Sequence, residues 1–394
     1  MLTCYGILQP FLPGMKNTSK KIFLVVTEIN FFYSHRYALI KKLSSMGWQF
    51  YIISYFKDAK PQDEKNINYI FIGSNREVFG ILNLLKNSFT LFKLIRLKKP
   101  DLIYAVSHRS IFLARMASLF SSTKLIFAIT GMGSLFTSHP NILKRTFLIS
   151  LKYVVLSIYR FVIRSKKSYF ILQNADDLNL LIAKSISTKE GAFIVPGNGL
   201  PDAYFSYIDA PLNKFNFIMI ARLLRDKGVI EFLSAAKLLS KDFKNCQFTL
   251  YGDYDLTNPQ AINQSEIEGY LSDNIVYAGF EPNIRNKIID SNVVVLPSYR
   301  EGFARVLMEA QACARPIITS DISGCRDVII DKSTGFLVKS MDSHDLASKM
   351  RFFLENPNIY TQMSKNSYKH AKNKFTISQA ADHHVKIFNK ILLR

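Results

Sequence analysis

Short apolar runs alternate with amphipathic segments along most of the chain. Several runs, such as Val293–Leu296, contain no polar residue. Strands that are buried on both faces of a parallel sheet have this continuous apolar pattern. The first series of predicted strands comprises Lys21–Ile29, Phe50–Phe56, Tyr69–Ile72, Asp101–Val106, Lys124–Thr130, Tyr169–Gln173 and Ala192–Val195. The second series comprises Asn216–Ile220, Gln247–Tyr251, Ile275–Ala278, Val293–Leu296, Pro316–Thr319 and Gly335–Val338.

Helical patterns such as Gly228–Leu239 and Val306–Ala314 lie between these runs. This alternation predicts an α/β protein with two doubly wound, Rossmann-like domains that face a cleft. A stretch rich in turn residues at 196–213 suggests the boundary. We therefore expect a first domain at 1–197 and a second at 198–376. The last segment, 377–394, should be a helix that packs back on the first domain.

Composition excludes several classes of protein. Of the 394 residues, 48% are hydrophobic and 13% aromatic, which excludes a disordered chain. The four cysteines, Cys4, Cys246, Cys313 and Cys325, show neither CxxC nor zinc-finger spacing. We expect a reducing compartment and no structural metal. The first twenty residues lack the pattern of a signal peptide.

Positive charge is concentrated in the first half of the chain. Residues 1–200 hold 27 Lys and Arg but 9 Asp and Glu, whereas residues 201–394 hold 24 and 21. A half with a net charge of +18 suggests a polyanionic partner: nucleic acid, anionic lipid or a phosphate-bearing substrate. The nucleic-acid alternative lacks an aromatic-basic RNA motif and a helix-turn-helix, and we expect no nucleic-acid partner.

The segment Thr146–Ile163 has the length of a membrane span but contains Lys152 and Arg160. Each interior charge costs about 2.5–3.5 kcal/mol on insertion scales, which disfavours spanning. Arg145, Lys152, Tyr159 and Lys166 recur every seven residues, so they should share one helical face. Val154, Val155, Ile158, Phe161 and Val162 should lie largely on the other face. Lys144, Arg160, Arg164 and Lys167 add charge nearby. The pattern fits either a surface helix packed on the core or a basic helix on a membrane.

Two cations follow the first strand of the second series. Arg222 and Lys227 lie five residues apart between that strand and the next helix. Arg can bind phosphate oxygens bidentately, and Lys adds a point charge. A diphosphate is the ligand that this pair suits, although such pairs at helix starts are common on surfaces.

A second group of polar residues follows the buried strand Val293–Leu296. Gly302 allows close approach of the backbone to a ligand. The amides of the next residues, Phe303, Ala304, Arg305 and Val306, should lie at a helix start, which favours an anion. Glu301 and Glu309, at either end, can accept hydrogen bonds from sugar hydroxyls, although each could also be an ordinary surface carboxylate.

These residues resemble the retaining glycosyltransferases of family 4, which have the two-domain GT-B fold. Glu301–Glu309, EGFARVLME, resembles the E-x7-E motif of that family. Ala221–Gly228, ARLLRDKG, resembles its Arg-x4-Lys phosphate clamp, and Asn198–Gly199 resembles its turn at the domain crossover. The resemblance covers nearly the whole chain and is strongest over residues 216–330.

A closer resemblance is to the subgroup that transfers N-acetylgalactosamine from UDP to a saccharide on polyprenyl diphosphate, as in O-antigen biosynthesis. It is carried by MIARLLRDKGVIEF, VLPSYREGF and SDISGC. Shorter matches include Tyr33–Arg36 and the loop Gly131–Phe136, so His35, Gly131, Gly133 and Ser134 are candidates for acceptor contacts. The chain departs from the broader family at Asn30–Tyr33, where a Gly-Gly loop is usual, and at Ala304, where Gly is common.

The resemblance implies roles for the site residues. Arg222, Lys227 and the Gly302–Arg305 amides would stabilise the departing nucleoside diphosphate. Glu309 would bind the ribose, and Glu301 would face the transferred sugar. The family retains anomeric configuration by front-face attack, with the donor phosphate taking the acceptor's proton. A polyprenyl acceptor also implies a peripheral enzyme on the cytoplasmic face of the inner membrane.

Three further sites depend on local context. His108 follows a strand of the first domain and should face the cleft near the transferred sugar, unless it is a structural histidine. His383 and His384 lie on the last helix and are expected at the surface. Asp253–Tyr254–Asp255 mimics the Asp-x-Asp metal motif of another glycosyltransferase fold. Because the clamp already supplies positive charge, we expect no metal.

Other functions stay open at this point. A family 4 transferase could use a hexose, a GDP-sugar or another acceptor. A nucleic-acid-binding protein would explain the basic half but not the two strand-end motifs. A nucleotide-sugar epimerase or a phosphorylase could share the fold, although no cofactor-lysine motif supports a phosphorylase.

Overall fold

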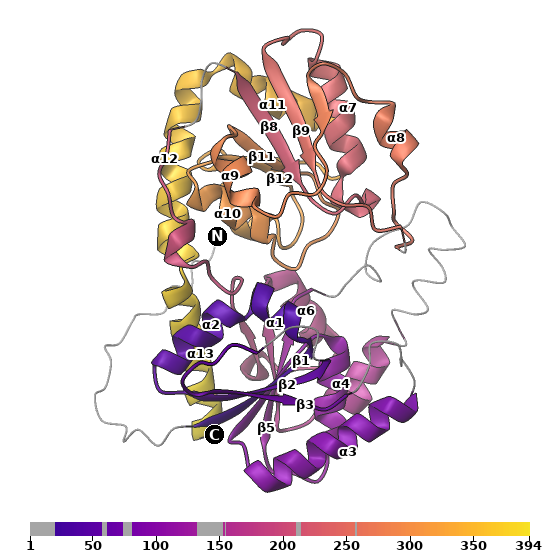
Figure 1. Ribbon diagram of the computed structural model, residues 1–394, viewed down its shortest axis with the longest axis vertical. Coiled ribbons are helices and arrows are strands. Elements are labelled where there is room, and N and C mark those ends of the chain that lie inside the picture. The colour runs from indigo at the N-terminus through magenta and orange to yellow at the C-terminus, as the bar shows by residue number, and fades with distance from the viewer. Residues whose placement is uncertain are drawn as a thin grey trace.

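The computed structural model describes residues 20–56, 61–73, 81–131, 153, 155–209, 214–256 and 258–394. Two parallel sheets form the centres of two domains, one above the other in Figure 1. Every predicted strand is present, with its ends shifted by two residues at most. The prediction of a doubly wound α/β fold is therefore confirmed.

The first sheet has seven strands in the order β3-β2-β1-β4-β5-β6-β7. Its strands are β1 (Lys21–Glu28), β2 (Gln49–Phe56), β3 (Ile67–Phe71), β4 (Leu102–Val106), β5 (Lys124–Ile129), β6 (Ser168–Leu172) and β7 (Ala192–Ile194). All neighbouring pairs are parallel. Every residue of β4 and β6 is buried, as the apolar runs require. The strand order reverses between β1 and β4, and ligands of such sheets bind at that point.

Helices cover both faces of this sheet. One face packs against α1 (Ile29–His35), α2 (Tyr37–Ser45) and α13 (Ile377–Leu393). The other packs against α3 (Ile81–Lys98), α4 (His108–Ala117), a π-helical turn at Tyr159–Ile163 and α6 (Ala175–Ala183). Asn174 caps α6 by accepting a hydrogen bond from the Asp177 amide at 2.8 Å.

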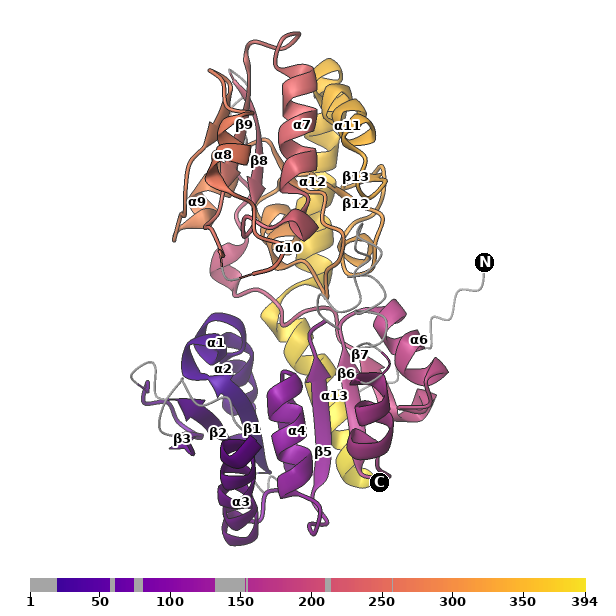
Figure 2. The same cartoon turned by 90° about the vertical axis from the view of Figure 1, so that its right-hand side faces the viewer.

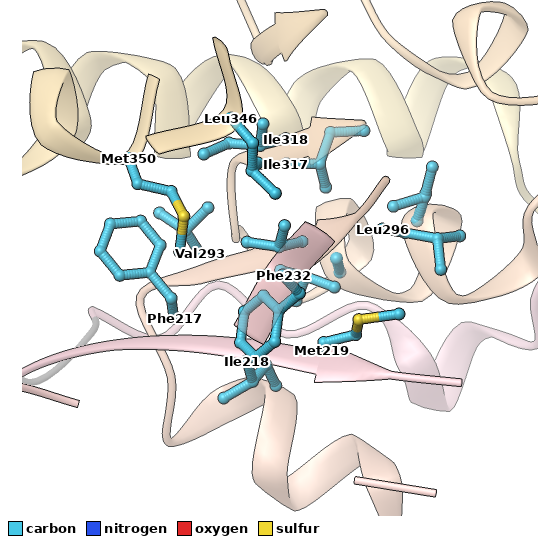
Figure 3. Packing of buried hydrophobic residues seen from close by; sticks show 14 of the residues in the cluster. Phe217, Ile218, Met219, Phe232, Val293, Leu296, Ile317, Ile318, Leu346 and Met350 are labelled. Carbon is cyan, nitrogen blue, oxygen red and sulfur yellow. The ribbon is translucent and has the colours of Figure 1, made fainter. Parts of the chain in front are cut away.

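The second sheet has six parallel strands in the order β10-β9-β8-β11-β12-β13. They are β8 (Phe215–Ile220), β9 (Cys246–Tyr251), β10 (Ile275–Tyr277), β11 (Val293–Leu296), β12 (Ile317–Ser320) and β13 (Gly335–Val338). The helices are α7 (Val229–Leu239), α8 (Gln264–Glu268), α9 (Ile284–Ile289), α10 (Arg305–Ala312), α11 (Ser343–Glu355) and α12 (Pro357–Lys374). Figure 3 shows Phe217 and Val293 of the sheet close to Met350 of α11 in the core of this domain.

The chain returns to the first domain at its end. α12 belongs to the core of the second domain, whereas α13 lies along the first (Figures 1 and 2). A capping box of Thr376 and Gln379 begins α13, and Phe388 packs edge-on against Trp48 at 5.3 Å. The domains are thus joined by two chain crossings.

Two expectations about this domain are wrong. Tyr159, placed on the basic face, is 5% exposed, and Phe161, placed on the apolar face, is 78% exposed. Tyr159 is buried because its side chain joins the core and its hydroxyl bonds to the His108 ring. After it, the Arg164 amide bonds to the Tyr159 carbonyl, so residues 159–163 form a π-turn in which α-helical spacing no longer holds. His384 is fully buried rather than at the surface, since Tyr104 and the Ala380 carbonyl supply partners for its ring.

Candidate active site

The two strand-end motifs of the second domain meet at one edge of its sheet. The loop 221–228 follows β8, and the loop 297–304 follows the neighbouring strand β11. Two hydrogen bonds join the loops, because the Tyr299 amide and the Ser298 hydroxyl both donate to the Asp226 carbonyl at 2.8 and 2.9 Å. The strand order reverses here too, so this edge is where a ligand is expected.

Lys227 and Glu301 form an ion pair at this edge. Lys227 Nζ lies 2.6 Å from Glu301 Oε1, and their side chains are 19% and 17% exposed. The loops can approach this closely because Gly228, with φ +77°, has no side chain. A Cβ there would lie 2.1 Å from the Pro297 carbonyl oxygen. The pair places the Lys227 ammonium at the carboxyl ends of the strands. An anionic ligand that binds this ammonium would have to replace the Glu301 carboxylate.

Gly302 lies directly against the first domain. A Cβ at Gly302 would lie 1.7 Å from the Thr130 carbonyl oxygen and 3.0 Å from Gly131 Cα. Asn174, also of the first domain, donates its Nδ2 to the Gly302 carbonyl at 2.8 Å. The loop before α10 therefore forms part of the contact between domains. Its next residues, Phe303 and Ala304, are buried.

The first turn of α10 carries a charged pair. Arg305 Nε lies 2.8 Å from Glu309 Oε1, one helical turn away. Burial raises the pKa of Glu309, and the Arg305 charge opposes that shift. Arg305 also donates to the Ser34 carbonyl of the first domain. This guanidinium therefore connects the E-x7-E segment to the opposite wall of the cleft.

A cavity of about 950 Å³ lies between the domains. Six of the candidate site residues line it: His35, Asn198, Arg222, Arg305, Val306 and Glu309. The Lys227–Glu301 pair, Gly302, Phe303 and Ala304 are not among its lining residues. The cavity size is in the range of small-molecule and cofactor sites.

Sequence reasoning missed the far end of this cavity. Tyr251 ends β9, Gly252 and Asp253 follow it, and the segment 280–284 follows β10. Phe280 is 69% exposed, which leaves a large aromatic face open to a ligand. These residues lie at the carboxyl ends of the next two strands of the same sheet, so strand order could have identified them.

The Asp-x-Asp segment has another use in this structure. Asp255 Oδ2 lies 3.0 Å from Arg222 NH1, and Asp253 lines the cavity. Among the described residues, no cluster of three or more His, Cys, Asp or Glu side chains is placed to hold a metal ion. Cys246, Cys313 and Cys325 are buried free thiols.

His35 forms part of the first-domain wall. Its ring stacks on Phe31 at 4.7 Å, and its Nδ1 lies 2.7 Å from the Ser34 hydroxyl. Loss of hydration, followed by the charges of Arg305 and Arg36, lowers the pKa of His35. A neutral imidazole can both accept and donate a hydrogen bond. Asn198 donates to the His35 carbonyl at 2.9 Å, so the crossover segment supports this wall.

His108 lies at the carboxyl end of β4, outside the lining of the large cavity. Its Nδ1 bonds to the Tyr159 hydroxyl, and the ring also has a hydrogen bond with the Gly131 backbone. Loss of hydration lowers the pKa of His108. The preceding Ser107 has φ +81° and ψ 151°, a strained conformation that is concentrated at functional sites. Gly133 and Ser134 lie outside the described residues.

Ion pairs at the domain contact were also missed. Arg300 NH2 lies 3.1 Å from Asp177 Oδ1, and Arg326 NH1 lies 3.6 Å from Asp176 Oδ2. Both carboxylates lie in the first turn of α6. They pair across the cleft with arginines of the second domain, and sequence spacing gives no indication of such contacts.

The sequence matches two family models, one in each half. Residues 21–174 match the model described as glycosyl transferase 4-like, and residues 203–370 match glycosyl transferases group 1. The two matched regions contain the site loops of both domains.

Two enzymes of known activity are similar over most of their length. N,N'-diacetylbacillosaminyl-diphospho-undecaprenol alpha-1,3-N-acetylgalactosaminyltransferase of Campylobacter jejuni is 25% identical over 91% of this chain and 96% of its own. UDP-Gal:alpha-D-GlcNAc-diphosphoundecaprenol alpha-1,3-galactosyltransferase of Escherichia coli is 23% identical over 81% of this chain and 83% of its own. Among solved structures, a glycosyltransferase from Rickettsia africae superposes with a TM-score of 0.76, at 18% identity, over 95% of this chain and 99% of its own.

Proposed function

Because the chain belongs to the glycosyltransferases of the group 1 and family 4-like kind, we propose that it transfers a sugar from a UDP donor to a saccharide carried on polyprenyl diphosphate. The names of the two relatives support this. Both specify α-1,3 transfer to an undecaprenyl-diphosphate-linked sugar, and they differ in moving N-acetylgalactosamine or galactose. N-acetylgalactosamine is our first choice, since the relative that moves it matches more of the chain.

The observation that carries the proposal is the position of the cationic strand-end motifs beside a cavity between two domains. The donor would occupy the second-domain side. Its base would lie near Tyr251 and Phe280, and its ribose would bond to Glu309. Its diphosphate would lie between Arg222 and the backbone amides at the start of α10, where helix geometry favours an anion.

Departure of UDP is the step that this arrangement would assist. As the bond from the sugar C1 to the phosphate oxygen breaks, negative charge develops on that oxygen. Arg222, Lys227 and the amides of Gly302, Phe303 and Arg305 would stabilise it, whereas the Ala304 amide already donates to the Gly324 carbonyl. Lys227 would exchange its 2.6 Å contact with Glu301 for a phosphate oxygen. Glu301 would then be free to bind a hydroxyl of the transferred sugar.

The first domain would hold the acceptor. His35 is the last residue of α1, which follows β1, and His108 is the first residue of α4, which follows β4. β1 and β4 are neighbours in the first sheet. We assign retention of configuration, with front-face attack by the acceptor hydroxyl. The donor phosphate would take the hydroxyl proton, and neutral histidines would orient the sugars by hydrogen bonds.

A lipid-linked acceptor requires the enzyme to work at a bilayer. In the part of the chain with described coordinates, no helix has the length and hydropathy needed to span a membrane. We propose peripheral binding to the cytoplasmic face of an anionic membrane, through basic residues that include Arg160, Arg164, Lys166 and Lys167. Three further basic residues of this segment, Lys144, Arg145 and Lys152, lie outside the described residues.

A donor screen tests the proposal. UDP-N-acetylgalactosamine, UDP-galactose, UDP-glucose and a GDP-hexose are each incubated with the protein and a short-chain prenyl-diphosphate saccharide. We expect UDP release that depends on the acceptor, and a product whose new linkage is α by NMR. Acceptor-dependent release of GDP would reassign the donor, a β product would remove the retaining mechanism, and no release with any donor would contradict the function.

A further inference from the structure

α3 presents an unusual surface to solvent. The helix turns Leu91 and Ile95 toward the sheet, where they join the core. On its outer side, large apolar residues are exposed: Leu82 by 82%, Leu85 by 49%, Phe89 by 57% and Leu97 by 75%. Soluble proteins scatter such residues singly, whereas a group on one helix face indicates an interaction site.

Basic residues share the same outer face. Lys86, Lys93 and Arg96 are exposed and occur at three- and four-residue spacing with the apolar group. Lys93 Nζ lies 4.5 Å from the centre of the Phe89 ring, so the two residue types are interleaved rather than separated. The helix contains no acidic residue. We call this set the α3 face: Leu82, Leu85, Lys86, Phe89, Lys93, Arg96 and Leu97.

We propose that the α3 face docks on an anionic lipid bilayer. Apolar side chains can enter the boundary between headgroups and acyl chains, while the lysines and arginine contact the phosphates. Four basic residues within the helix, Lys86, Lys93, Arg96 and Lys98, favour a helix that lies on the membrane over one that crosses it. The stripe of alternating positive and apolar residues fits an anionic surface better than a second copy of this basic chain.

The position of α3 suits a lipid-linked acceptor. β3 ends at the carboxyl edge of the sheet, which faces the cleft between the domains, and β4 begins at the opposite edge. α3 connects the two strands and therefore runs away from the cleft. Leu82 and Leu85 therefore lie at the end of the helix nearer the cleft. An 18-residue helix is about 27 Å long, which gives an extended contact with a membrane.

A neighbouring segment extends the same side of the domain. α3 and α4 lie side by side over one face of the sheet (Figures 1 and 2), and the π-helical turn at Tyr159–Ile163 packs against α4. Phe161 and Arg160 of that turn are exposed. The described turn Tyr159–Ile163 of the basic segment and α3 thus lie on one side of the first domain. The biological purpose of this docking rests on the proposed lipid-linked acceptor. The test of the docking needs no acceptor.

Vesicle flotation of the full chain tests the docking. The probes are phosphatidylcholine vesicles with and without phosphatidylglycerol. The charge variant is Lys86→Glu with Lys93→Glu, and its matched control is Lys241→Glu with Lys244→Glu on the second domain. The apolar variant is Leu82→Ser with Phe89→Ser, and its control is Leu238→Ser with Leu256→Ser. All these positions are exposed.

We expect wild type and both controls to float with the anionic vesicles and to dissociate as salt rises. Each basic residue near such a surface contributes about fivefold to partitioning, so the charge variant should lose at least about 25-fold. The apolar variant should lose at least about tenfold. The proposal is overturned if wild type does not float or if the α3 variants float as well as their controls. It is also overturned if light scattering shows a dimer that the apolar variant loses, because a second copy would then cover the face.

Transfer to a water-soluble, short-chain acceptor without vesicles separates this inference from the function. Both α3 variants should keep the wild-type rate, since the α3 face lies outside the cavity lining. A wild type that floats but transfers nothing would remove the proposed function and leave the docking. A wild type that transfers but ignores anionic vesicles would remove the docking alone.

Discussion

Replacing Gly302 by Ala tests whether contact between the domains is needed for transfer. The new Cβ would lie 1.7 Å from the Thr130 carbonyl oxygen, and real Cβ contacts essentially never fall below 3.0 Å. The Gly302 loop and the Thr130 carbonyl must therefore move apart by at least 1.3 Å, either by separation of the domains or by a shift of the loop. Misplacement of reacting groups by about 1 Å can reduce a rate by about 100-fold, which is the loss of kcat that we expect.

Donor binding should suffer less than transfer in this variant. The loop is also held within the second domain, where the Ala304 amide donates to the Gly324 carbonyl at 3.1 Å. We therefore expect the Kd for UDP, measured by calorimetry, to change by less than about tenfold, while the initial rate of transfer falls.

Gly269→Ala is the matched control, because the nearest atom to its new Cβ is 3.7 Å away. Wild-type turnover in the Gly302→Ala protein would refute the reasoning. An equal loss of UDP binding and transfer would show instead that the donor loop itself is distorted.

Four further outcomes are expected. Lys227→Ala should lower kcat by about 100–1000-fold and also lower Tm, because Glu301 loses its partner. Adding Glu301→Gln should restore Tm but not turnover, as initial rates and thermal unfolding would show. Glu309→Gln should raise the donor KM more than it lowers kcat, and an unchanged KM would place Glu309 outside the ribose site. Burial lowers the pKa of His384 to about 3, so between pH 6.5 and pH 5 the free energy of unfolding should fall by about 1 kcal/mol per pH unit relative to His384→Gln in urea titrations. The exposed control His344→Gln should follow wild type. Dialysis against EDTA should leave the transfer rate unchanged, and loss that Mg²⁺ or Mn²⁺ restores would show a metal requirement.

The sign of the His384 effect follows from which state binds the proton. Unfolded His384 titrates near 6.5, whereas the buried ring takes a proton only near pH 3. Falling pH therefore stabilises the unfolded chain through this window, and the stability present above pH 6.5 is lost progressively. His370, whose pKa burial lowers to about 4, should add a similar loss, so the comparison is made between variants.

Strands could be predicted closely because burial on both faces leaves a strong local pattern. Val293–Leu296 was predicted without error, since all four residues are apolar and buried. Parallel pairing of the strands follows from the alternation of strands and helices. By the same logic, the two motifs after β8 and β11 were expected at a common edge, and the structure brings their loops into contact.

Contacts between distant segments could not be predicted from one sequence. Nothing near Gly302 indicates that Thr130 lies against it, and nothing near Lys227 indicates that Glu301 pairs with it rather than with solvent. The α3 face was missed for a different reason. Apolar residues at helical spacing usually indicate a core face, and only the structure distinguishes Leu91, which is buried, from Phe89, which is exposed. The error at Tyr159 arose because its contact with His108, 51 residues earlier, cannot be read from residue spacing.

A crystal structure of the protein with UDP tests the central claim most directly. The account predicts UDP in the cavity between the domains, with its base beside Phe280, its ribose on Glu309 and its diphosphate between Arg222 and the start of α10. Lys227 should have moved from Glu301 toward the phosphates. UDP bound elsewhere, or a cavity that stays empty at saturating UDP while Lys227 keeps its contact with Glu301, would contradict the account.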